Sequence, residues 1–119
     1  MKKLISWVEI PTENFERAVK FYNSILKLDL QVFDCGEEKM ACFPGGEGAV
    51  IFAKGHKPSS IGTIVSLNTE KKLDETLANI ESKGCKIIQP KTKIQIEGLG
   101  YCALFIDCEG NKIGLYGDN

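Results

Sequence analysis

Apolar side chains recur at helical spacing in two stretches of the chain. In the first stretch they form one stripe, made of Phe15, Ala18, Val19, Tyr22, Ile25 and Leu26. In the second they form the inner face of a helix, made of Leu73, Leu77, Ile80 and Ala78. Thr12 or Asn14 supplies the N-cap of the first helix, and Lys83-Gly84 supplies a typical ending for the second.

Shorter runs around these helices have the composition of strands. They cover residues 4–10, 29–34, 38–43, 49–54, 61–67, 85–89, 92–97, 101–107 and 111–116. Turn signals such as Pro44-Gly45-Gly46 and Glu109-Gly110 separate neighbouring runs. The resulting order, β-α-β-β-β followed by β-α-β-β-β, predicts an internal repeat.

The repeat is also visible in the residues themselves. "EGAVIFAKG" (47–55) and "EGNKIGLYG" (109–117) share Glu, Gly, Ile and a final Gly, which aligns Phe52 with Gly114 and Trp7 with Thr63. We therefore expect one α+β domain over residues 1–119, with module one about 1–56 and module two about 61–119. The two tandem βαβββ modules would form a curved, mainly antiparallel sheet with a cleft, and the helices would lie outside.

Composition excludes several classes of protein. The net charge is −1, from 15 basic and 16 acidic residues, so the chain lacks the basic footprint of a nucleic-acid binder. No apolar run is long enough to cross a membrane. Five cysteines occur without a C-x-x-C spacing or a secretion signal, which predicts reduced thiols and a cytoplasmic location.

Two segments carry a resemblance to a known family. Residues 7–28, "WVEIPTENFERAVKFYNSILKL", and residues 100–117, "GYCALFIDCEGNKIGLYG", resemble the vicinal oxygen chelate superfamily of glyoxalases, bleomycin-resistance proteins and extradiol dioxygenases. The second segment is similar to that family's D-P-x-G-N-x-I-x-L ending, with Cys108 where proline is common. The resemblance implies a homodimer, and it leaves open whether modules pair within one chain or are exchanged between two.

The resemblance also implies a divalent metal, held by His, Gln or Glu side chains from the first and last strands of each module. The matching positions here are Trp7, Phe52, Thr63 and Gly114, and only Thr63 carries even a weak donor. A glutamate often stands at the position of Gly114, which would explain a glycine inside a strand. We therefore expect no metal and no cofactor. The cleft would survive as an aromatic pocket, or Trp7 and Phe52 would fill it as core.

A few other side chains are candidates for the same site. Glu9 lies two residues after Trp7 and so on the same strand face. It is the best acid–base candidate in the chain. It could equally bind the amine of a ligand, or be a carboxylate in water at the rim of the cleft. Tyr116 lies two residues after Gly114 and offers a hydroxyl to a ligand. The single histidine, His56, lies in a polar loop and is expected to face solvent. We assign no catalytic residue.

Three functions are compatible with these observations. The first is a metal-free protein that binds a small amphipathic or aromatic molecule through Trp7, Glu9, Phe52, Thr63, Gly114 and Tyr116. The second is a metal-dependent lyase, isomerase or dioxygenase of the glyoxalase type, which lacks the ligands it requires. The third is a structural or regulatory module without a ligand. Whether any reaction is catalysed stays open, although metal-dependent catalysis is the less favoured reading.

Overall fold

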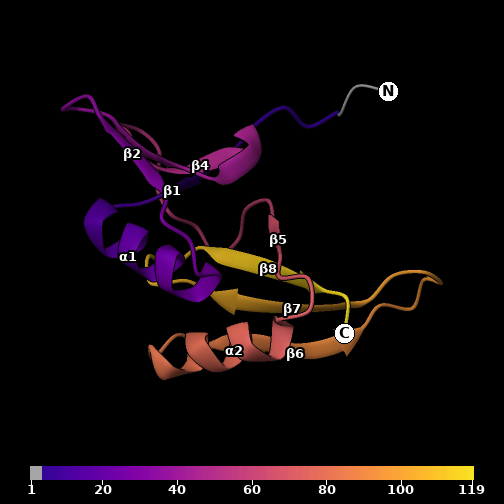
Figure 1. The fold of residues 1–119 in the computed structure, drawn as a ribbon. Coiled ribbons are helices and arrows are strands. Elements are labelled where there is room, and N and C mark those ends of the chain that lie inside the picture. Colours follow the sequence, from indigo (N-terminus) through magenta and orange to yellow (C-terminus); the bar gives the residue numbers. More distant parts are fainter. Residues whose placement is uncertain (1–3) are drawn as a thin grey trace. The chain divides into compact units, whose positions relative to one another are not determined.

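The computed structural model describes residues 4–119. Its elements in chain order are β1 (Val8–Pro11), α1 (Phe15–Leu26), β2 (Gln31–Asp34), β3 (Lys39–Cys42), the 3-10 turn η1 (Pro44–Gly46), β4 (Gly48–Phe52), β5 (Ser66–Asn68), α2 (Leu73–Ser82), β6 (Ile87–Lys93), β7 (Tyr101–Ile106) and β8 (Lys112–Gly117). The chain divides into two compact units, one ending at Pro58 and the other beginning at Ser59 (Figure 1). Each unit has the order βαβββ and one four-stranded sheet, which confirms the α+β fold of two tandem modules.

The sheet of module one has the strand order β1-β4-β3-β2. β1 runs parallel to β4, with Ile10 beside Val50, and β3 runs antiparallel to β4, with Ala41 on the other side of Val50. All three of these side chains are buried, and α1 contacts β4. Asn14 caps α1, because its side-chain oxygen accepts a hydrogen bond from the Arg17 N–H at 3.2 Å. The core of this module therefore lies between α1 and one face of the sheet.

Module two repeats this arrangement with the strand order β5-β8-β7-β6. β5 runs parallel to β8, and α2 contacts both β6 and β8. The side chains of α2 that are buried are Leu73, Thr76 and Ile80, whereas Ala78 is exposed. The predicted inner face was therefore wrong at Ala78. Thr76 occupies the helical stripe between Leu73 and Ile80, and its polarity hid it from a search for apolar residues.

The region around Pro90 differs from the sequence expectation. Strands were predicted at 85–89 and 92–97, but one strand, β6, runs through Ile87–Lys93. β6 is an edge strand, and its pairing with β7 shifts register between Ile87 and Gln89 and again between Gln89 and Thr92. Proline is tolerated at such irregular edges because its missing N–H leaves no ladder bond unmade. The break expected between residues 89 and 92 is thus a pair of local irregularities inside a single strand.

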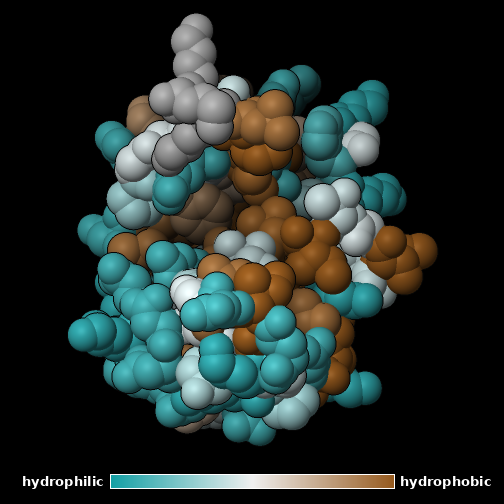
Figure 2. Space-filling view, turned by 90° about the vertical axis from the view of Figure 1, so that its right-hand side faces the viewer, coloured by the Kyte–Doolittle hydropathy of each residue, from teal (hydrophilic) through white to brown (hydrophobic). Residues whose placement is uncertain are grey.

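Several large apolar side chains remain exposed among residues 4–119. They are Leu4, Ile5, Trp7, Val32, Phe33, Ile61, Ile64, Ile88, Ile96 and Leu99. Figure 2 shows one face of the molecule on which hydrophobic side chains, in brown, reach the surface among hydrophilic ones. Exposed apolar surface of this kind often marks a place where another molecule binds. No helix in the described part of the chain is long and apolar enough to cross a membrane.

Candidate functional site

A matching set of hydrogen bonds fixes which residues of the two modules are equivalent. Thr12 directs both its N–H and its hydroxyl to the Ile51 carbonyl oxygen, at 2.9 and 2.8 Å. Thr69 does the same with the Tyr116 carbonyl oxygen, at 2.8 and 2.9 Å. Thr12 is therefore the structural counterpart of Thr69, and Ile51 is the counterpart of Tyr116.

This equivalence corrects the alignment drawn from the sequence. Trp7 and Ile64 each lie five residues before their threonine, and Ala49 and Gly114 each lie two residues before their acceptor. The ladders agree, because Glu9 pairs with Ala49 and Ser66 pairs with Gly114. The sequence alignments of Trp7 with Thr63 and of Phe52 with Gly114 were therefore wrong.

The source of the error is the shared Glu-Gly pair that begins both aligned segments. Gly48 lies inside β4, whereas Gly110 lies in the turn before β8. The Asp107 carboxylate organises that turn by accepting hydrogen bonds from the Glu109 and Asn111 N–H groups at 2.8 and 2.9 Å. The same Glu-Gly pair therefore lies at the start of a strand in one module and in a turn in the other.

Phe52 lies on a different face of the first sheet from Trp7 and Glu9. Its ladder partner is Lys39, whose Nζ atom lies 3.4 Å from Glu16 Oε2 on α1, so both residues belong to the helix-covered face. Residues that are neighbours across a ladder point to the same face of a sheet. Glu9 and its partner Ala49 therefore belong to the opposite, open face. The structure joins Trp7 to Glu9 by a hydrogen bond and places Phe52 on the other face of the sheet, although Glu9 and Phe52 both line one pocket.

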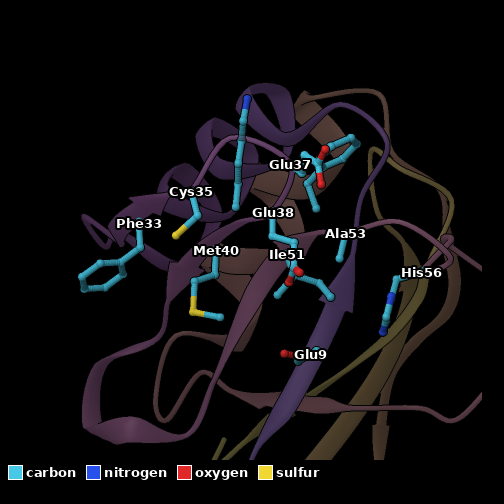
Figure 3. Close-up of a pocket in the computed structure, with 11 residues that line it drawn as sticks. Glu9, Phe33, Cys35, Glu37, Glu38, Met40, Ile51, Ala53 and His56 are labelled. Atoms are coloured by element: carbon cyan, nitrogen blue, oxygen red, sulfur yellow. The ribbon is translucent and has the colours of Figure 1, made fainter.

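A pocket of about 510 Å³ opens on module one. Its lining consists of Glu9, Phe33, Cys35, Glu37, Glu38, Lys39, Met40, Ile51, Phe52, Ala53 and His56 (Figure 3). Its apolar floor is a ladder row in which Met40 pairs with Ile51 on one side and with Phe33 on the other. All of these residues lie between Glu9 and His56, so the pocket belongs to module one alone. The cleft between the modules that the sequence predicts stays a prediction.

The Trp7 side chain is fixed at the border of this pocket. Its Nε1–H donates a hydrogen bond of 3.2 Å to Oε2 of Glu9, which lines the pocket. Trp7 is 42% exposed, so its ring is not part of the buried core and can contact a bound molecule. In Figure 3 the Glu9 carboxylate projects from β1 toward the strand that carries Ile51. This pair gives the pocket an acceptor oxygen beside an aromatic surface.

Two lining residues show what sequence reasoning missed. His56 is exposed, as expected from its loop, but it also lines the pocket. Met40 and Cys42 were left unassigned between the two faces, and the ladder places both on the open face, where Met40 reaches the pocket. Only the register of β3 against β4 distinguishes those faces, and alternation within β3 does not reveal it.

The remaining predicted residues belong to module two and lie outside this pocket. Thr63 is exposed and precedes β5. The Tyr116 hydroxyl accepts a hydrogen bond from the Gly100 N–H at 3.1 Å, which ties it to the start of β7. Gly114 is buried and pairs with Ser66. Their roles in binding a ligand stay predictions.

Comparison with known proteins places these modules in a family. Residues 4–115 match the sequence model of the Glyoxalase/Bleomycin resistance protein/Dioxygenase superfamily. The chain belongs to this superfamily. A search of curated proteins finds no match.

Several solved structures share the fold. A glyoxalase/bleomycin resistance protein/dioxygenase family enzyme from Burkholderia phytofirmans PsJN aligns with a TM-score of 0.72 at 15% identity, over 97% of this chain and 98% of that one. TnmS3, an antibiotic binding protein from Streptomyces sp. CB03234, aligns with a TM-score of 0.63 at 16% identity, over 99% and 98%. The fosfomycin resistance protein FosX from Listeria monocytogenes, solved with Mn(II) and sulfate, aligns with a TM-score of 0.70 at 15% identity, over 100% and 93%. At these identities the likeness establishes the fold alone.

The residues of this superfamily member do not fit the metal that the resemblance implies. The equivalent positions are Trp7 and Ile64, just before the first strand of each module, and Ala49 and Gly114, on the last strand, and none carries a usual metal ligand. Among residues 4–119, no three His, Cys, Asp or Glu side chains gather closely enough to hold an ion. The space beside Gly114 is used differently, because a side chain there would displace the Ser66 hydroxyl and meet Ile64 at 3.4 Å. The glycine thus accommodates Ser66.

Proposed function

We propose that this superfamily member is a binding protein for a small amphipathic or aromatic molecule and that it works without a metal. The observation that carries the proposal is the pocket on module one, with the Trp7–Glu9 hydrogen bond at its border. Its volume of about 510 Å³ lies within the range of ordinary ligand sites, which combine an apolar lining with a few placed polar groups. Met40, Ile51 and Phe33 supply the apolar part, and Glu9 supplies a fixed polar group.

The absence of donors at the equivalent ligand positions supports the metal-free part of the proposal. A catalytic zinc or manganese site needs three or more N, O or S donors that converge on one centre. Trp7, Ala49, Ile64 and Gly114 offer none. A metal-dependent lyase, isomerase or dioxygenase would therefore need a donor set other than the one the resemblance implies.

Trp7 fluorescence tests binding directly, because Trp7 is the only tryptophan in the chain. Phenylbutanol, a neutral amphipathic probe, is expected to change Trp7 emission saturably, with affinity on the order of millimolar for so small a molecule. The Trp7→Phe variant provides the control, because it loses the signal and keeps an apolar ring. If amphipathic probes raise the thermal stability of the protein but leave Trp7 emission unchanged, they bind elsewhere, and this pocket is not the binding site.

We further infer that the protein is a cytoplasmic homodimer. All five cysteines are free thiols, which supports a reducing compartment. Every residue of β2, an edge strand of the first sheet, is exposed, and an unprotected sheet edge favours pairing with another copy. Sedimentation velocity would reveal a monomer at all concentrations if the dimer is wrong.

A further inference from the structure

The distribution of charge around the pocket of module one indicates which molecules it selects. We propose that the ligand is an amphipathic amine, whose ammonium group binds Glu9 and whose apolar body lies along Met40 and Ile51. The proposal names the ligand class of the same pocket, and it therefore depends on the function proposed above.

The lining carries more negative than positive charge. Its carboxylates are Glu9, Glu37 and Glu38, and its only lysine is Lys39. The ammonium group of Lys39 is matched elsewhere, because its Nζ atom lies 3.4 Å from Glu16 Oε2 and 4.0 Å from Asp34 Oδ2. Glu16 and Asp34 do not line the pocket. The positive charge of Lys39 is therefore paired with carboxylates that lie outside the pocket.

The three lining carboxylates have no ion-pair partner within the described residues 4–119. His56 is the one further titratable base in the lining, and its Nδ1 atom is 3.2 Å from the Lys54 carbonyl oxygen. With three carboxylates and one lysine, the lining has an excess of negative charge that Lys39 does not cancel. A cationic group entering the pocket gains attraction from this charge, whereas an anionic group meets repulsion.

Trp7 acts as a positioning residue for Glu9. The indole N–H binds Oε2, which restricts rotation of the carboxylate and leaves Oε1 to accept from a ligand. Hydrogen bonds between an ammonium and a carboxylate are stronger than neutral ones, so an amine gains more here than an alcohol of the same shape. The half-exposed ring also provides a face that attracts a cation.

The apolar part of the lining continues from this polar end. Met40 and Ile51 are ladder partners on the open face, and Phe33 extends the row beyond Met40. Figure 3 shows the Met40 side chain between those of Phe33 and Glu9 in this view. A molecule with one cationic end and one apolar end matches such a row, because methionine adapts to differently shaped apolar bodies.

Three probes with one apolar body and different charges test the proposal. Phenylbutylamine, phenylbutanol and phenylbutyrate are titrated by calorimetry into the whole chain at low and high salt. We expect the amine to bind about tenfold more tightly than the alcohol, or about 1.4 kcal/mol, and the carboxylate to bind weakest. High salt is expected to weaken amine binding, because salt screens the attraction between charges that are partly exposed to solvent. Binding of the alcohol should not change, because the alcohol carries no charge.

Variants of the recognition pair separate charge from shape. Glu9→Gln should reduce amine affinity about tenfold and leave alcohol affinity unchanged, while Trp7→Phe should reduce the preference for the amine. Asp29→Asn is the matched control, since Asp29 is an exposed carboxylate of the same module outside the lining, and it should keep the preference. Circular dichroism of each variant verifies folding.

The outcomes distinguish this proposal from the proposed function. Equal affinity for the three probes, with a Trp7 fluorescence response, overturns the selection of amines and leaves the binding function intact. An amine preference that persists in Glu9→Gln also overturns it. Failure of all three probes to bind contradicts both proposals.

Discussion

The hydroxyl groups of Thr12 and Thr69 provide a direct test of the module equivalence. Thr12→Val and Thr69→Val keep the side-chain shape but remove the hydroxyl that donates to Ile51 or Tyr116. Each carbonyl oxygen keeps its bond from the threonine N–H, at 2.9 and 2.8 Å, so no buried acceptor is left without a partner. The expected loss of stability is therefore that of one hydrogen bond, about 1 kcal/mol per substitution.

Urea denaturation and thermal scanning measure this loss. For a chain of 119 residues, 1 kcal/mol corresponds to a fall in Tm of roughly 4 °C. The two threonines lie in different modules, so the double variant should lose about the sum, within about 0.5 kcal/mol. Thr63→Val is the control, because Thr63 is exposed and its change should stay within about 0.5 kcal/mol.

One result would refute the reasoning. If Thr69→Val destabilises no more than the exposed control Thr63→Val, the Thr69 hydroxyl does not stabilise this junction. If only one of Thr12→Val and Thr69→Val is destabilising, the two threonines do not play equivalent parts. Either result would also remove the basis for pairing Trp7 with Ile64 and Ala49 with Gly114.

Two further predictions concern metal ions. Elemental analysis of the purified protein should find no stoichiometric zinc, nickel, iron or manganese, and one ion per chain that only a chelator removes would contradict the metal-free proposal. Within module two, Ile64→His combined with Gly114→Glu should raise nickel affinity at least tenfold, because a side chain at position 114 meets Ile64. Thr63→His combined with Gly114→Glu is the matched control, and an equal gain in calorimetry would restore the sequence alignment.

The fold could be predicted from the sequence because its signals are local. The stripe from Phe15 to Ile25 specifies an amphipathic helix whatever the rest of the chain does, and its buried residues confirm it. The strand order follows from runs and turns in the same way. Pro90 shows the limit, because a proline breaks a central strand but is accepted at a bulged edge. Only the position of β6 within the sheet decides between those outcomes.

The site was less predictable because register is not a local property. The period of a strand is two residues, so an alignment error of one residue moves a side chain to the other face. Aligning Trp7 with Thr63 instead of Ile64 was an error of one residue, which selects the wrong face. Aligning Gly114 with Phe52 instead of Ala49 was an error of three residues, and Phe52 lies on the helix-covered face. Glu9 was placed correctly beside Trp7 because that inference used only their separation along one strand.

The two modules differ at equivalent positions that face away from their helices. The paired hydrogen bonds of Thr12 and Thr69 are the same in both, since each joins the first strand of a module to its last. On the open faces, Trp7 and Glu9 in module one correspond to Ile64 and Ser66 in module two. Neither Ile64 nor Ser66 offers an aromatic N–H or a carboxylate. Residues that join strands hold the fold, whereas residues on the open face are available for recognition, and in module one they border a pocket of ligand size.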